Sequence, residues 1–123
     1  MVTLGVRDLE ATRAFYQDVF GYELLDGGHV PAAAAAAWNV PEGCEASHAV
    51  LGRPEATRGL LRLVAFDQPG ENAWGRYERI QDYGHYALNF RVADLKATWP
   101  RLLRAGVRPK SAPTYWTIDE SMA

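Results

Sequence analysis

The sequence has little that would indicate a membrane protein, a disulfide framework or a nucleic-acid partner. It contains one cysteine, Cys44, which cannot form an internal disulfide and which we interpret as a small apolar residue or an idle thiol. No segment approaches the roughly 18 consecutive apolar residues of a membrane helix. The net charge is −2 over 123 residues, which gives no electrostatic reason to expect nucleic acid or an anionic membrane as a partner. Because a predicted strand follows Met1 directly, we expect no signal peptide and a cytoplasmic protein.

The most informative feature present is a repeat. Val6-Arg-Asp-Leu-Glu-Ala-Thr12 and Val92-Ala-Asp-Leu-Lys-Ala-Thr98 are identical at five of seven positions, 86 residues apart. Each copy follows an alternating apolar pattern typical of a strand and opens a helical pattern that reaches a glycine, Gly21 or Gly106. The sequence therefore predicts one domain of 123 residues built from two related modules.

The first module is predicted to span residues 1–66. Asp8 is placed to cap the first helix, because its carboxylate can accept free N–H groups of the first turn. Asp26-Gly-Gly28 has the composition of a turn, and the alanine-rich segment from Pro31 favours a short helix. The expected elements are a strand over 2–6, a helix from Leu9 to Gly21, a strand over 22–25, a short helix over 31–38, and strands over 46–51 and 60–66.

A polar linker is predicted over 67–83, followed by the second module over 84–123. Alternating apolar residues predict a strand over 86–92, and Asp94 is placed to cap the helix that follows. Pro100 falls within that helix, where a proline removes a backbone hydrogen bond. Either the helix kinks at Pro100 or its regular part begins near that residue. A further strand is predicted over 113–118, so the second module looks incomplete.

The pattern Val-x-Asp-Leu-Glu-x-x-x-x-Phe-Tyr-x-x-x-x-Gly-Tyr-Glu-Leu-Leu over 6–25 resembles the vicinal oxygen chelate superfamily, which includes glyoxalase I, bleomycin-resistance and fosfomycin-resistance proteins and extradiol dioxygenases. Asp82-Tyr-Gly-His-Tyr-Ala-Leu88 resembles the start of the second module in the fosfomycin-resistance branch. The resemblance implies an α+β fold of paired βαβββ modules whose cupped mixed sheet holds a ligand on its concave side. Members of the superfamily often form homodimers, and we expect one here.

The same resemblance implies four positions for ligands of a divalent metal. The first-strand position corresponds to Met1, whose thioether is a poor ligand for hard or borderline divalent ions. The fourth-strand position corresponds to Arg62, which stays protonated and cannot bind a metal. The second-module position corresponds to His85, a suitable ligand, and the last position would lie beyond residue 123. One of four positions is thus filled, so we expect either no cofactor or a metal held partly by His85.

Strand alternation gives a separate prediction of the binding residues. If the apolar sides of the strands pack under the helices, the opposite sides face the cup. Thr3, Arg62, His85 and Asn89 would then face a ligand. Arg62 could bind an anionic group or form an internal salt bridge with Glu78 or Asp82. Trp38 could close over the pocket if the short helix acts as a lid, or the helix could simply pack at the sheet edge. We interpret His29 and His48 as surface or turn residues.

Three functions remain open at this point. The leading hypothesis is a small-molecule-binding protein without a complete metal site, like the bleomycin-resistance members. The second is a divalent-metal-dependent lyase, thiol transferase or dioxygenase, whose ligands are completed outside this chain and whose metal would act as a Lewis acid. The third is a non-catalytic module of a larger protein. No phosphate-binding glycine loop or nucleophile motif is present, so catalytic residues are not assigned.

Overall fold

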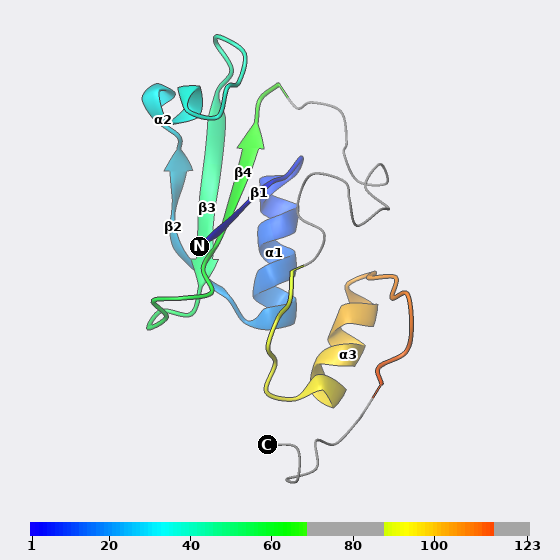
Figure 1. Ribbon diagram of the computed structural model, residues 1–123. Coiled ribbons are helices and arrows are strands. Elements are labelled where there is room, and N and C mark those ends of the chain that lie inside the picture. The colour runs from blue at the N-terminus through cyan, green and yellow to red at the C-terminus, as the bar shows by residue number, and fades with distance from the viewer. Residues whose placement is uncertain (69–87, 115–123) are drawn as a thin grey trace, which may run out of the picture.

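A computed structural model describes residues 1–68 and 88–114 of the chain. The described part is an α+β fold with a four-stranded mixed sheet (Figure 1). No helix among the described residues is both long and apolar enough to cross a membrane. The elements in chain order are β1 (Val2–Gly5), α1 (Leu9–Phe20), β2 (Glu23–His29), α2 (Ala32–Ala36), β3 (Ala46–Gly52), β4 (Leu61–Phe66) and α3 (Leu95–Arg104).

The strand order in the sheet is β1-β4-β3-β2. The first strand pairs in parallel with β4, and the register places Thr3 beside Arg62. The other two pairings are antiparallel, with Val50 opposite Arg62 and His48 opposite Val64. The first module therefore forms the strand–helix–three-strand unit that the sequence predicts.

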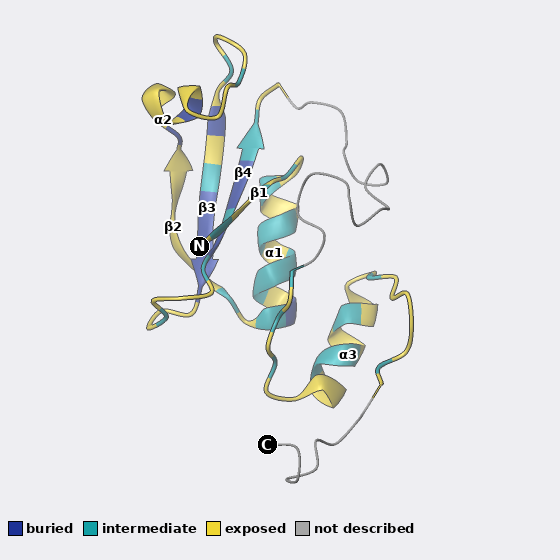
Figure 2. Ribbon diagram, viewed as in Figure 1, coloured by how far each residue is buried: buried dark blue, intermediate teal, exposed yellow. Residues whose placement is uncertain are grey.

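One face of the sheet packs under α1, and we call it the α1 face. Its core consists of Leu51, Leu61 and Leu63, which are almost completely shielded from solvent. Val2 and Leu4 pack against this core, as strand alternation predicts. Figure 2 shows the contrast between the buried central strands β3 and β4 and the exposed edge strand β2.

The opposite face is covered at one end by the segment that contains α2. Val30 and Ala35 from that segment pack with Ala46 and Val64 from the sheet. The predicted short helix over 31–38 is thus confirmed in part, as α2. Because α2 packs on the sheet through a buried alanine, it covers part of the face where the sequence places the ligand.

The repeated sequence forms the same cap on both long helices. The Oδ1 atom of Asp8 accepts the N–H of Ala11 at 2.9 Å, and that of Asp94 accepts the N–H of Ala97 at 3.1 Å. The third helix begins directly after Asp94 and continues through Pro100. The prediction that its regular part begins near Pro100 is therefore wrong.

The prediction that the second strand ends in a turn at Asp26-Gly-Gly28 is also wrong. Instead β2 continues to His29, and Gly27 and Gly28 pair with Ala49 and His48. A register irregularity between Leu24 and Asp26 lets the strand bend without ending. The two glycines therefore serve a bent edge strand, where the sequence pattern indicated a turn.

The strand predicted over 86–92 is not present in its described part, because residues 88–92 have no strand pairing. Leu88 packs instead against the core of the α1 face, and Phe90 stacks on Phe20 with ring centroids 4.5 Å apart. The described apolar residues Leu88 and Phe90 are thus half-buried beside α1 without joining the sheet. Most of the strand predicted over 113–118 and most of the linker lie outside the described residues.

Candidate functional site

Register places several predicted binding residues on the side of the sheet opposite α1, which we call the Arg62 face. Thr3 of β1 lies beside Arg62 of β4 on this face. Strand alternation adds His48 and Val50 of β3, which pair with Val64 and Arg62. The structure therefore brings two of the predicted residues, Thr3 and Arg62, side by side.

Arg62 is half-buried, and the Nε atom of its guanidinium group is shielded from solvent. Within the described part of the chain, this Nε has no hydrogen-bond partner. The sequence offers Glu78 and Asp82 as partners for an internal salt bridge of Arg62, and both lie outside the described residues. Because Nε itself is shielded, an acceptor brought by a ligand would meet the other N–H groups of the guanidinium fork.

His48 is a functional candidate that the sequence analysis missed. It was interpreted as a surface or turn residue, but it lies in the middle of β3, half-buried. Its Nδ1 atom is shielded and has no hydrogen-bond partner among the described residues. The alternation of Ala46, His48 and Val50 could have identified this position, because these three residues share one side of a strand.

His48 and Arg62 are diagonal neighbours on adjacent strands, since His48 pairs with Val64 and Val50 pairs with Arg62. Residues in this relation lie about 7–8 Å apart, within reach of long side chains. One small polar group could therefore accept hydrogen bonds from both side chains. The Arg62 face thus combines one permanent cation with a histidine that can donate or accept.

The remaining predicted binding residues lie elsewhere. Trp38 follows α2 and meets Phe66 edge to face, with ring centroids 6.1 Å apart, at the α2 end of the Arg62 face. Its side chain is still 37% exposed, so the indole covers Phe66 without being enclosed. Asn89 is exposed between Leu88 and Phe90, which pack on the α1 side of the sheet. His85 lies outside the described residues.

The donor atoms of the Arg62 face do not fit a divalent metal. Arg62 is a cation, and Met1 at the other implied position is 61% exposed and offers only a thioether. Nowhere in residues 1–68 and 88–114 do three His, Cys, Asp or Glu side chains come together in a group that could hold a metal ion. We therefore derive no chemical step through a metal.

A cleft of about 800 Å³ lies on the other side of the sheet, between the start of α1 and strands β2, β3 and β4. Its polar groups include Glu10 and Arg13 of α1, His29 of β2, and Glu45 and Asp67 at the strand ends. The sequence analysis did not identify this cleft. The sequence feature that corresponds to the cleft is a set of small residues on the α1 face, namely Gly27, Ser47, Ala49 and Ala65.

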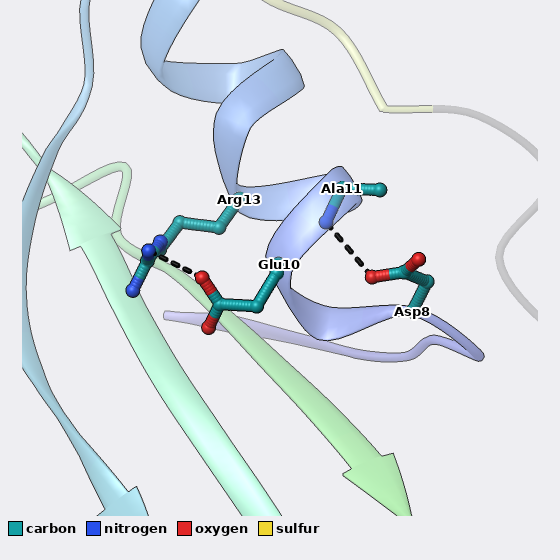
Figure 3. Close-up of polar contacts among 4 residues, drawn as sticks. All are labelled: Asp8, Glu10, Ala11 and Arg13. Atoms are coloured by element: carbon teal, nitrogen blue, oxygen red, sulfur yellow. Dashed lines mark hydrogen bonds and ion pairs between the residues drawn. The ribbon is translucent and has the colours of Figure 1, made fainter.

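The wall of this cleft that belongs to α1 contains an ion pair. Figure 3 shows Arg13 and Glu10 joined one helical turn apart, near the cap formed by Asp8 and Ala11. The pair leaves the Nε atom of Arg13 shielded from solvent and without a hydrogen-bond partner in the described part of the molecule. The guanidinium group of Arg13 in the cleft wall is therefore partly neutralised by Glu10.

Comparisons with known proteins agree with this architecture. The solved structure of a glyoxalase family protein from Bacillus cereus matches with a TM-score of 0.77 and 19% sequence identity, covering 94% of this chain and 76% of that one. At this identity, the likeness concerns the fold alone. No curated protein matches the sequence. The family model for the glyoxalase/bleomycin resistance protein/dioxygenase superfamily matches residues 1–119, and the chain therefore belongs to that superfamily.

Proposed function

We propose that the protein binds a small organic molecule through an anionic or strongly accepting group held on the Arg62 face. The observation that supports this most directly is that Arg62 and His48, both half-buried, are diagonal neighbours on adjacent strands of one face. An arginine fork matches the geometry of a carboxylate or phosphate. A neutral histidine protonated on Nε2 adds a second donor to the same group.

The rest of the ligand would lie against apolar surface near Trp38 and Phe66. These two rings meet at the α2 end of the same face, where Phe66 lies two residues after Val64 in β4. Small-molecule sites combine mostly apolar walls with a few convergent polar groups, and this face offers both. Membership of the superfamily supports a ligand-binding role but does not specify the ligand.

The proposal includes the absence of a complete metal site, because Arg62 and Met1 stand where the superfamily resemblance implies metal ligands. Metal content per chain of the purified protein tests this part, with His85→Ala as the comparison. We expect no stoichiometric divalent metal in either protein, even after incubation with nickel, manganese or zinc. About one equivalent that is lost in His85→Ala would support the metal-dependent enzyme instead.

Binding itself can be tested with simple anionic probes. We would titrate phenylphosphonate, benzoate and inorganic phosphate into the wild type and into Arg62→Gln, using isothermal titration calorimetry. Loss of a charge-assisted hydrogen bond of about 1.5–3 kcal/mol predicts at least tenfold weaker binding of the aromatic anions by the variant. Arg58→Gln is the matched control, because Arg58 is exposed in the β3–β4 turn and has the same charge.

Two results would contradict the proposal. Equal affinities of the wild type and Arg62→Gln would show that the anions bind elsewhere. Weakening by Arg58→Gln as large as that by Arg62→Gln would show that only net charge matters. His48→Gln should weaken the same anions less than Arg62→Gln does, because histidine contributes no permanent charge.

We also propose that the protein forms a homodimer, as the superfamily resemblance implies. The exposed edge strand β2, with all seven residues open to solvent, is a surface that a second chain could cover. Sedimentation equilibrium of the purified protein is the direct test, and a monomer across the accessible concentration range would contradict the expectation.

A further inference from the structure

We infer that the cleft between α1 and the sheet is a second ligand site, suited to a small organic amine with a neighbouring hydrogen-bond acceptor. This inference does not rest on the proposed function, because the cleft lies on the α1 side of the sheet and the Arg62 face is on the other. The shape of the cleft, its charge and the guanidinium group of Arg13 support a site of this kind.

The shape follows from the size of the residues on the α1 face. At one end, Leu51, Leu61 and Leu63 fill the space under α1. At the other end, the same face has Ser47 opposite Ala65, and Gly27 opposite Ala49. Because these side chains are small, the sheet leaves a hollow of about 800 Å³ under the first turns of α1. That volume lies within the range of about 300–1,000 Å³ typical of ligand sites.

A larger residue cannot easily replace Gly27 in the floor of the cleft. A Cβ atom on Gly27 would stand 3.0 Å from the carbonyl oxygen of His48 and 3.6 Å from Cδ1 of Leu24. The first contact is with backbone, so even alanine at this position requires the strands to shift. Leu24 also lines the cleft and is 45% exposed, which leaves apolar surface for a ligand to cover.

The charges around the cleft favour a cation. Three acidic residues of the α1 side line it, Glu10, Glu45 and Asp67, against a single guanidinium group from Arg13. One oxygen of Asp67 also accepts the backbone N–H of Glu45 at 2.9 Å. Because that guanidinium group is paired with Glu10, its positive charge is largely offset within the wall. The remaining carboxylates leave a negative potential over the floor, which attracts an ammonium group.

A simple cation would not use the guanidinium group of Arg13. Its Nε atom is shielded from solvent and out of reach of a ligand, but the side chain as a whole is 32% exposed. The best ligand therefore also brings an acceptor, such as a carbonyl oxygen, to the other N–H groups of Arg13. An apolar body would then cover Leu9 and Leu24. The ligand class is thus an amine with an adjacent carbonyl and an apolar substituent.

Three related probes separate these requirements. Phenylalanine amide has the amine, the carbonyl and an aromatic ring; 2-phenylethylamine lacks the carbonyl, and 3-phenylpropanamide lacks the amine. We would follow backbone amide shifts of the isotopically labelled full chain by NMR during each titration. Phenylalanine amide should shift the amides of Gly27, Ser47 and Ala65 in a saturable manner. The other two probes should bind at least threefold more weakly.

Two variants, each with a matched control, locate the effect. Ser47→Leu fills the floor and should abolish the saturable shifts, whereas Thr57→Leu adds the same side chain in the exposed β3–β4 turn and should leave them unchanged. Glu45→Gln removes one carboxylate and should weaken phenylalanine amide at least threefold, whereas Glu55→Gln in that turn should not. Circular dichroism and the remaining amide shifts establish that each variant is folded.

Several outcomes would overturn the inference. These are the absence of saturable shifts in the wild type, equal binding of all three probes, or unchanged binding in both Ser47→Leu and Glu45→Gln. Loss of the phenylalanine amide shifts at Ser47 and Ala65 as the protein concentration rises would show that a second copy covers the cleft, and would also overturn it. Shifts at Thr3 and Arg62 would report the other face, so the two proposals can fail separately.

Discussion

The Asp8 carboxylate accepts a hydrogen bond from the backbone N–H of Ala11 at 2.9 Å, and it thereby fixes the start of α1 over the sheet. Its counterpart in the repeat, Asp94, forms the same bond with Ala97 at the start of α3. The two helices differ in what they bury. Val19 of α1 is buried, whereas α3 has no fully buried residue.

This difference predicts unequal effects of the same substitution. Asp8→Ala should lower the free energy of unfolding by about 1 kcal/mol, the usual cost of losing a helix cap. Asp94→Ala should lower it less, because α3 can fray without exposing a core residue. Urea denaturation of both variants measures the two effects. Equal losses would show that α3 unfolds together with the sheet.

Leu63 is completely buried in the core of the α1 face. Leu63→Ala should therefore destabilise the protein by about 2–5 kcal/mol, through lost burial and the cavity left behind. Leu103→Ala is the control, because Leu103 is 47% exposed and its truncation should change stability by only about 0.5 kcal/mol. A small loss in Leu63→Ala would mean that the sheet does not form the stable core.

Gly27→Ala should be destabilising by about 1–3 kcal/mol, the range for overpacking, because its Cβ would press on the His48 carbonyl oxygen. Gly5→Ala is the matched control in another edge strand, since a Cβ at Gly5 meets nothing within 4 Å. Thermal or urea denaturation compares the two. If Gly5→Ala cost as much as Gly27→Ala, the contact with His48 would not be the cause.

Burial raises the pKa of the Tyr16 hydroxyl above its ordinary value of 10.0, and interaction with Tyr22 raises it further. The folded state therefore binds this proton more tightly than the unfolded state. The resulting stability is fully present below about pH 10 and is lost as the pH rises through the higher pKa of the folded state. Tyr16→Phe should lose less stability than the wild type between pH 9 and 11 in urea titrations. If the free energy of unfolding fell equally in the wild type and in Tyr16→Phe, the raised pKa of Tyr16 would be contradicted.

Much of the first module could be predicted from the sequence because its signals are local. Alternating apolar residues identified β3 and β4, and Asp8 and Gly21 marked the ends of α1. The wrong predictions concern segments whose local pattern fits two structures. Gly27 and Gly28 suit a turn or a bent edge strand, and alternation over 86–92 suits a strand or an extended segment. Only pairing partners distinguish these alternatives.

The candidate sites, too, could be predicted only in part from the sequence. Strand alternation was enough to place Thr3 and Arg62 on one face, but the register between strands was needed to bring His48 near Arg62. The cleft under α1 could not be predicted, because it arises where small residues from three strands meet below one helix.

The sequence by itself determined the superfamily, the capped helices and the alternation of each strand, since these depend on residues close together in the chain. The tertiary structure alone decided which side chains of different strands lie next to one another and where a hollow remains. It also placed the shielded nitrogen atoms of Arg62, His48 and Arg13, which have no hydrogen-bond partner in the part of the chain that the structure describes. These properties depend on strand register and helix packing, which join residues far apart in sequence and are set by the whole core.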